Sequence, residues 1–260
     1  MNTFKYTLLL LVALLQFSFT SDSTFQYRSQ NHTAFTYGEE LRYKIHYGFI
    51  NAATAKIKID PNSVEVDGRP TYHITAKGRT NSGFDWMYKV RDHFETWVDT
   101  ASMAPLKYFK LVKENKYKDV DLVYYNHEEE KLRGKKKNME MPRYAQDVVS
   151  GMFYARTLDF SDAKPGDTYP INIYLDQEIY KLKFKFLGKE TISTKFGKIR
   201  CLKIRPQVVA DRVFKDEDSM TIWVSDDNNR IPLRVSSSLW VGAIKCDLVE
   251  HKGLKHPLGK

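Results

Sequence analysis

Residues 145–160 read AQDVVSGMFYARTLDF, and this stretch departs from the pattern of the rest of the chain. Its apolar residues recur at intervals of three and four, the spacing of an amphipathic helix; they are Ala145, Val148, Val149, Met152 and Phe153. Asp147, or a residue just before it, is the predicted N-cap, and KPGD at 164–167 prevents the helix from continuing. The stretch therefore predicts one principal helix.

Around this helix, apolar and polar residues alternate with the period of two that is typical of half-buried strands. Leu41, Tyr43, Ile45 and Tyr47, for example, alternate with charged residues and a histidine. Similar runs continue along the chain as far as VGAIKCDLVE at 241–250. The predicted fold is mainly β: a large curled antiparallel sheet of ten or more strands, an open or half β-barrel, with the principal helix packed on or in it.

The N-terminal sequence MNTFKYTLLLLVALLQFSFTSDS has the layout of a cleaved secretory signal, with one Lys, a short apolar run and small residues before Ser21. The apolar run is shorter than the roughly 20 residues that span a bilayer. We predict a signal peptide over residues 1–20, a flexible lead over 21–36, a single β-rich domain over 37–252 and a basic tail over 253–260. The protein is expected to be exported.

The charge is basic but dispersed. Lys and Arg number 41 against 32 Asp and Glu, a formal net charge of +9. Only residues 135–137 and the C-terminal tail form basic patches, and a solvated face is the simpler interpretation of each. In an exported protein the natural anions are membranes or envelope polymers, so nucleic acid is not an expected partner.

The stretch IWVSDDNNRIPLRV at 222–235 raises three interpretations: a metal loop, paired catalytic acids or a turn. An EF-hand loop starting at Asp226 needs Gly at its sixth and Glu at its twelfth position, but Ile231 and Ser237 stand there. Adjacent carboxylates at a strand end diverge, whereas Asp and Asn suit tight hairpins. We therefore predict a turn between two strands, with Pro232 at a strand start or an edge.

Several stretches resemble a bacterial exported family of unknown function, DUF3108, over nearly the whole mature sequence. They are GEELRYKIHYGFINAATAKI, VRDHFETWVDTASMAP, QDVVSGMFYAR, FGKIRCLKIRP and WVSDDNNRIPLRV, followed by Gly242 and Leu248. One departure is Ala52-Ala53, where the family usually has Gly after the first hairpin. The resemblance implies a Gram-negative periplasmic location and no established activity. At fold level the chain is also remotely similar to the half-barrel periplasmic carriers that hold lipoproteins or lipids.

Signatures of common hydrolases and nucleotide-binding enzymes are missing, including G-x-S-x-G, H-E-x-x-H and a Gly-rich phosphate loop. An enzyme that acts on an envelope component is therefore less expected than the two binding functions described below, and no catalytic residue, metal or cofactor is expected. His46, His73 and His93 are interpreted as polar-face histidines rather than a zinc site.

Two other sets of residues are interpreted structurally. Asp147, Ser150 and Arg156 could form a polar site. We interpret Asp147 instead as a helix cap, Ser150 and Gly151 as positions that allow close packing, and Arg156 as an ion-pair partner. Strand alternation points the thiols of Cys201 and Cys246 to opposite faces, which argues against a disulfide.

Two tryptophans lie on strand faces whose other residues are polar. Trp97 alternates with Glu95 and Asp99, and Trp223 alternates with Thr221 and Ser225. Such a side chain packs under the helix, lines a cleft, or belongs to a sheet covered on both faces. We hypothesise that an apolar ligand such as an acyl chain binds at this face; its predicted binding residues are Phe84, Trp86, Met87, Tyr88, Trp97 and Trp223.

The leading function is thus a non-enzymatic, monomeric protein that binds a lipid or acyl chain, with a role in the cell envelope and peripheral contact with a membrane. The alternative is a structural or adaptor protein that binds an anionic polymer or an envelope protein. Added salt distinguishes the two functions. It should weaken binding to an anionic polymer, because salt screens exposed charges, but it should not weaken the burial of an apolar ligand.

Overall fold

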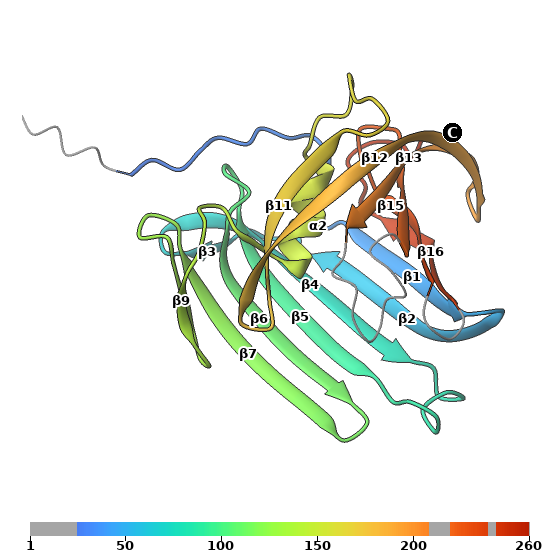
Figure 1. The fold of residues 1–260 in the computed structure, drawn as a ribbon, viewed down its shortest axis with the longest axis horizontal. Coiled ribbons are helices and arrows are strands. Elements are labelled where there is room, and N and C mark those ends of the chain that lie inside the picture. Colours follow the sequence, from blue (N-terminus) through green and yellow to red (C-terminus); the bar gives the residue numbers. More distant parts are fainter. Residues whose placement is uncertain (1–24, 208–218, 239–242, 260) are drawn as a thin grey trace, which may run out of the picture.

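The computed structural model describes residues 25–207, 219–238 and 243–259 (Figure 1). The predicted signal peptide, residues 1–20, lies outside this part of the chain. The first nine strands are β1 (Glu40–Tyr47), β2 (Ile50–Ile59), β3 (Val64–Val66), β4 (Arg69–Thr80), β5 (Arg91–Asp99), β6 (Pro105–Glu114), β7 (Tyr117–Asn126), β8 (Lys131–Gly134) and β9 (Asn138–Glu140). Then follow β10 (Gln146–Asp147), helix α2 (Val148–Arg156), β11 (Thr168–Leu175), β12 (Glu178–Thr194), β13 (Gly197–Gln207), β14 (Met220–Ser225), β15 (Pro232–Ser238) and β16 (Ala243–Lys252).

All of these strands belong to one curled sheet. Its order is β10-β11-β12-β13-β14-β15-β16-β1-β2-β4-β5-β6-β7-β8-β9, with β3 paired to β4 beside this path. Two meanders therefore meet in the middle of the sheet, where β16 pairs with β1. In the described residues the edge strands β10 and β9 do not pair with each other, so the sheet is open. This confirms the predicted fold class, and Pro232 is the first residue of β15, as expected.

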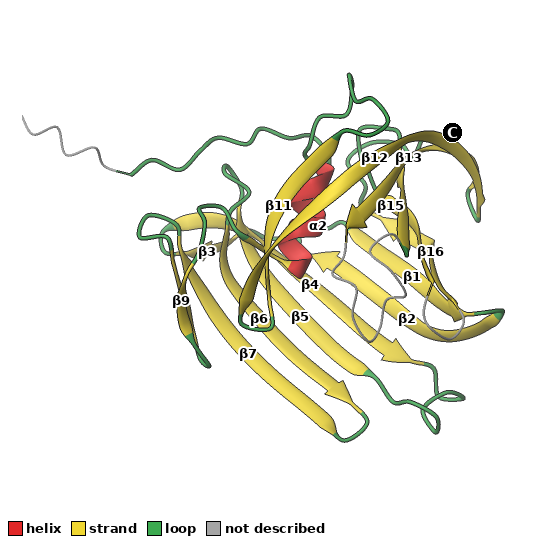
Figure 2. Ribbon diagram, viewed as in Figure 1, coloured by secondary structure: helices red, strands yellow, loops and turns green. Residues whose placement is uncertain are grey.

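The helix is the crossover between the two parallel strands of an otherwise antiparallel sheet. Strand β10 leads directly into α2, and β11 then pairs with β10 in parallel. A parallel pair needs such a connection, because a tight hairpin can only join antiparallel strands. Figure 2 shows α2 as the single red element against the yellow strands. The helix lies inside the curl, in contact with β4 and β5 on one side and β11 on another.

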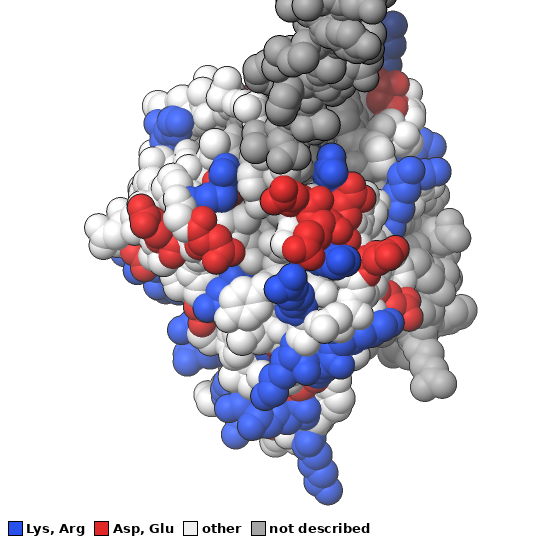
Figure 3. All heavy atoms as spheres, turned by 90° about the vertical axis from the view of Figure 1, so that its left-hand side faces the viewer, with Lys and Arg blue, Asp and Glu red and all other residues white. Residues whose placement is uncertain are grey.

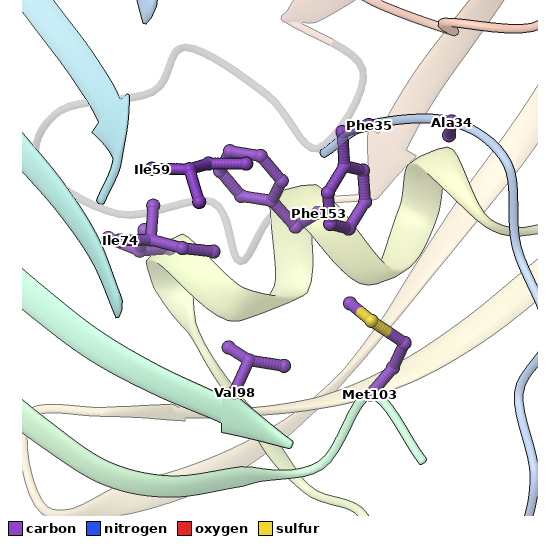
Figure 4. Close-up of a cluster of buried hydrophobic side chains, with 8 residues drawn as sticks. Ala34, Phe35, Ile59, Ile74, Val98, Met103 and Phe153 are labelled. Atoms are coloured by element: carbon purple, nitrogen blue, oxygen red, sulfur yellow. The ribbon is translucent and has the colours of Figure 1, made fainter. Parts of the chain in front are cut away.

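A hydrophobic cluster joins the helix to the sheet (Figure 4). Phe153 is fully buried and meets the ring of Phe35 edge to face, with centroids 4.9 Å apart. Ile59, Ile74 and Val98 complete the cluster from β2, β4 and β5, and all three are fully buried. Because each such side chain stabilises the fold by about 1.5–3 kcal/mol, this contact holds α2 firmly on these strands.

Packed structure extends beyond the boundaries predicted for the domain. Ala34 and Phe35, in the predicted flexible lead, are buried core residues. In the predicted basic tail, Leu254 and Leu258 pack against a second core cluster, and the N–H of Gly259 donates to Oδ2 of Asp227 at 2.7 Å. Parts of both segments are therefore packed against the domain.

Candidate functional site

Asp147 fixes the start of helix α2. One of its carboxylate oxygens accepts hydrogen bonds from the N–H groups of Val149 and Ser150, both at 2.8 Å. Ser150 Oγ accepts in turn from the N–H of Asp147, and Thr96 Oγ1 on β5 donates to the other carboxylate oxygen at 2.6 Å. Burial raises the pKa of Asp147, while these hydrogen bonds oppose that rise. The prediction of a helix cap is confirmed.

The two sides of the helix have different surroundings. Val149 and Phe153 face the cluster on β2, β4 and β5. The adjoining side, with Val148, Met152 and Ala155, borders a cavity of about 210 Å³, and Met152 also packs against that cluster. Strands β11 to β14, the start of β15 and the connection between α2 and β11 form its other walls. The connection contributes Phe160, and the apolar lining from the strands is Ile173, Leu182, Phe184, Ile204, Ile222, Val224 and Pro232. The cavity is thus almost entirely apolar, which is the usual character of a small-molecule site.

Gly151 sets the spacing between the helix and this wall. A Cβ at this position would lie 2.6 Å from Cδ1 of Ile173 on β11. Glycine therefore allows α2 to approach β11 more closely than any other residue would. The prediction that this part of the helix packs closely is confirmed.

Arg156 ends the helix and lies at one end of the cavity. Its side chain is 2% exposed, and it donates to both carboxylate oxygens of Glu39, at 2.5 and 2.9 Å. It also donates to the carbonyls of Asn229 and Ala34, at 3.0 and 3.1 Å. This bidentate pair confirms Arg156 as an ion-pair partner and joins the helix to the residue that precedes β1. The bond to Asn229 joins the helix to the β14–β15 turn.

The turn between β14 and β15 places a second arginine beside the first. Asp227 Oδ1 accepts from Ser225 Oγ and from the N–H groups of Asn229 and Arg230, at 2.7, 2.9 and 3.1 Å. The predicted turn is therefore confirmed. Arg230 has a φ of 49°, the left-handed region that side chains seldom adopt, and the Asp227 carboxylate holds it there.

Arg230 is only loosely paired. Its Nη2 lies 3.9 Å from Oδ1 of Asp159, whose side chain is 78% exposed. The guanidinium carbon lies 5.8 Å from the centre of the Phe160 ring. Unlike the buried guanidinium of Arg156, this cation remains available to an anionic group at the end of the cavity.

A polar pocket adjoins the apolar cavity. It has a volume of about 280 Å³, and Arg156 and Arg230 line both spaces. Its other walls include Asn31, Thr157 and His32, and burial lowers the pKa of His32 to about 4. His32 is therefore neutral near pH 7, so the positive charge of the pocket comes from arginine.

The predicted ligand residue Trp97 lies on the outer face of β5, away from the helix. Its ring stacks on His73 with centroids 4.5 Å apart, and Lys107 Nζ lies 4.4 Å from the ring centre. Trp97 therefore does not pack under the helix, and its role in ligand binding stays a prediction. Stacking and a cation–π contact cover the indole instead.

Trp223 lies on the face of β14 that points away from the cavity, because its neighbours Ile222 and Val224 line the cavity on the other face. Its Nε1 donates to Glu190 Oε2 at 3.2 Å, and Lys203 Nζ lies 5.7 Å from its ring centre. Five strands separate β14 from β5 in the sheet, so the structure does not bring Trp223 and Trp97 together. Trp223 also packs against a buried cluster that includes Ile199 and Cys201, so the sheet is covered on both faces at this point, which was one of the three interpretations. A role of Trp223 in ligand binding stays a prediction.

The four remaining predicted residues lie in the connection between β4 and β5. Phe84 is half-buried, whereas Trp86, Met87 and Tyr88 are exposed. This connection is remote in the sheet from β11–β14, and none of the four lines the apolar cavity. Alternation in β13 and β14 places Ile204, Ile222 and Val224 on apolar faces, but it carries no sign that a cavity lies in front of them.

The histidines and cysteines occupy ordinary structural positions. His73 and His93 both approach Glu95, at 2.7 and 3.1 Å. Within the described segments, no group of three or more His, Cys, Asp or Glu is placed to hold a metal ion. Cys201 and Cys246 are free thiols, and burial raises the pKa of each to about 12.

None of the described helices is both long and apolar enough to cross a bilayer.

Comparison with solved structures gives likenesses at the level of the fold. A β-barrel-like protein of domain of unknown function DUF1849 from Brucella abortus is similar at 10% identity and a TM-score of 0.52, covering 85% of this chain and 98% of that one. A "putative exported protein with YmcC-like fold" from Bacteroides fragilis is similar at 11% identity and a TM-score of 0.41, covering 86% and 100%. A "putative lipoprotein" from Parabacteroides distasonis is similar at 13% identity and a TM-score of 0.36, covering 88% and 100%.

Sequence comparison is more specific. No curated protein matches the chain. The family described as "Protein of unknown function (DUF3108)" matches residues 42–249, far more than half of the sequence. This protein therefore belongs to the DUF3108 family.

Proposed function

We propose that this protein is a non-enzymatic binding protein of the cell envelope that holds an acyl chain in the cavity between α2 and β11–β14. The observation that carries the proposal is the lining of that cavity: apolar side chains on every wall and two arginines at one end. Ligand pockets share this composition, because apolar burial supplies affinity and a few polar groups fix orientation.

The volume restricts the ligand. At about 210 Å³ the cavity exceeds the roughly 150 Å³ of an engineered apolar cavity that binds benzene. It is below the range of about 300–1,000 Å³ that is common for sites of drug-sized ligands. A single acyl chain, or the terminal segment of one, fits these limits better than a complete two-chain lipid.

The arginines favour an anionic head group. Arg156 is neutralised by Glu39, whereas the nearest carboxylate to Arg230 is the exposed Asp159 at 3.9 Å. The polar pocket beyond Arg230 offers space for a carboxylate or phosphate. The proposed ligand is thus an acidic amphiphile, with its chain in the apolar cavity and its head beside Arg230.

The compartment is part of the proposal. The N-terminal sequence has the layout of a secretory signal, and the sequence lacks the hydrolase signatures named above. A periplasmic acyl-chain carrier or sensor accords with both observations.

Titration with a fluorescent fatty acid tests this function. Ala155→Phe places a ring from the helix into the cavity, and Arg230→Gln removes the loosely paired cation. The matched controls are Ala101→Phe, at an exposed position in the β5–β6 turn, and Arg200→Gln, whose side chain is 62% exposed and does not line the cavity.

We expect saturable binding that Ala155→Phe reduces by at least about tenfold, since the ring occupies the space of several chain carbons. Arg230→Gln should weaken a fatty acid but leave the affinity for the corresponding alcohol nearly unchanged. The controls should bind like the natural sequence. Absence of binding, or equal binding by Ala155→Phe and its control in folded protein, would contradict the proposal.

A second function is favoured by a different feature, a basic groove on the outer face of the sheet. It has a volume of about 570 Å³ and is lined by Arg42, Lys56, Lys77, Arg79, Arg91 and His93, among others. Lys56 lies directly opposite Lys77, and Arg79 lies directly opposite Arg91. Lys56 and Arg91 already pair with Glu40 and Asp85, so Lys77 and Arg79 are the cations that an anionic polymer would contact.

This adaptor function has its own test. Binding of an anionic polysaccharide should weaken steeply with salt, and Lys77→Gln with Arg79→Gln should reduce it. Binding that is insensitive to both changes would exclude the groove as the contact surface.

A further inference from the structure

The exposed apolar side chains of this protein are concentrated at one edge of the sheet. Nine large hydrophobic residues are exposed in the described part of the chain. Six of them lie at the β1–β2, β4–β5 and β6–β7 connections, which line the lower right edge of Figure 1: Phe49, Ile50, Trp86, Met87, Tyr88 and Tyr117. Phe49 is 95% exposed and Trp86 is 83% exposed, so these two side chains have almost no contact with the fold.

Hydrogen bonds join these three connections into one edge. The N–H of Asn81 donates to the carbonyl of Ala52 at 2.9 Å, which fixes the β4–β5 connection to β2. On the other side, Lys89 and Asn115 exchange two hydrogen bonds, each 2.8 Å long. The apolar tips are therefore held in a fixed arrangement.

Exposed cations lie among the apolar tips. They are Lys89, Lys113, Lys116 and Lys118, and none has an ion pair among the described residues. The acids of the same turns are already engaged: Asp85 pairs with Arg91, and Glu114 accepts a hydrogen bond from Tyr88 at 2.7 Å. Figure 3 shows Lys and Arg gathered over the lower end of the neighbouring face, below a band of Asp and Glu.

We propose that this edge docks on an anionic phospholipid membrane, with Phe49 and Trp86 inserted below the head groups and the lysines at the level of the phosphates. Trp and Tyr favour the membrane interface, because their rings are apolar and their N–H or O–H groups reach water. Lysine contributes attraction to anionic lipid while its aliphatic stem remains in the apolar layer.

A bilayer explains this surface better than the other anionic partners. A soluble polyanion would use the lysines but would leave the six apolar side chains in water. A protein interface buries a continuous patch with a well-packed centre, whereas these side chains project from the tips of separate turns. The inference does not depend on the acyl-chain cavity, which lies on other strands.

Vesicle flotation tests the proposal. Vesicles of pure phosphatidylcholine are compared with vesicles of phosphatidylcholine and phosphatidylglycerol, using the natural sequence and two double variants. One variant is Phe49→Ala with Trp86→Ala; the other is Lys116→Gln with Lys118→Gln. The controls are Leu175→Ala, which is exposed at the β11–β12 turn, and Lys198→Gln, which is exposed at the β12–β13 turn.

We expect preferential binding to the vesicles that contain phosphatidylglycerol. Each lysine change should lower the partition coefficient about fivefold, and each loss of a large apolar tip should lower it about tenfold or more. The controls should leave partitioning unchanged. Failure to bind either kind of vesicle would overturn the proposal. Unchanged binding by the variant Phe49→Ala with Trp86→Ala would also overturn it, because the protein would then adsorb through charge alone.

A spectroscopic measurement separates insertion from a folding defect. Brominated lipids should quench part of the tryptophan fluorescence in the natural sequence. Trp86→Phe should abolish that quenching while retaining most of the binding, because a phenyl ring also inserts. Quenching that persists in Trp86→Phe would overturn the placement of this edge in the membrane.

Discussion

Replacing Arg156 by methionine should strongly destabilise the protein. The guanidinium is 2% exposed and its partner Glu39 is 1% exposed, so the change leaves a carboxylate in the interior without a counter-charge. Breaking a buried pair in this way typically costs about 3–5 kcal/mol. The carbonyls of Asn229 and Ala34 also lose their donor.

We therefore expect the free energy of unfolding to fall by about 4 kcal/mol, and the melting temperature by on the order of 10 °C for a chain of this length. Urea denaturation followed by circular dichroism measures the first quantity. Arg42→Met is the matched control, because Arg42 and Glu250 are 46% and 37% exposed and pairs of that kind contribute about 1 kcal/mol or less.

A double-mutant cycle isolates the pair. Arg156→Met leaves the buried charge of Glu39 without a partner, and Glu39→Leu removes that charge. The loss of unfolding free energy in the double variant should therefore be smaller than the sum of the two single losses, by about 2 kcal/mol or more. Additive effects, or a loss below about 1 kcal/mol for Arg156→Met, would refute the role of this pair as the tie between the helix and the sheet.

Three further results are expected. The N–H of Tyr144 donates to Nδ1 of the fully buried His127, and burial lowers the pKa of His127 to about 4. Between about pH 6.5 and pH 4 the unfolded chain binds a proton that the folded chain excludes, so stability should fall as pH drops through this window, by up to roughly 3 kcal/mol from this residue. Urea denaturation should show a shallower fall for His127→Gln, and equal slopes would contradict the assignment. Cys201 and Cys246 should resist thiol reagents near neutral pH in the folded protein and should both react after denaturation, because burial raises their pKa to about 12; rapid native labelling would show that the sheet opens there. Gly151→Ala should change the free energy of unfolding by no more than about 1 kcal/mol, since better helix propensity offsets the close approach to β11. It should nevertheless weaken fatty-acid binding several-fold by displacing a methyl group into the cavity, and unchanged affinity would count against that location.

Local signals in the sequence predicted most of the elements. The apolar spacing of residues 145–160 and the Asp147 cap located the helix, because both signals act within two turns of chain. Alternation located the strands for the same reason. Strand β12 shows a limit of alternation, because a bulge between Phe186 and Gly188 interrupts the pattern while the strand continues to Thr194. Gly188 has a φ of 118° there.

The arrangement of the strands was beyond such signals. Nothing in the alternation of β16 specifies β1 as its neighbour, since pairing depends on contacts distant in sequence. The tryptophans illustrate the same limit: Trp97 is on the face that alternation assigned, but its contact with His73 depends on the cross-strand register. The cavity was unpredictable for a further reason, because it depends on how closely Gly151 lets the helix approach β11.

The most direct test of the acyl-chain function is native mass spectrometry of the full chain, expressed with its own N-terminal sequence and isolated gently from a bacterial envelope. The account predicts one acidic, acyl-bearing molecule per chain, retained in Ala101→Phe and absent from Ala155→Phe. A folded protein that carries no lipid, or one whose lipid persists in Ala155→Phe, would contradict it.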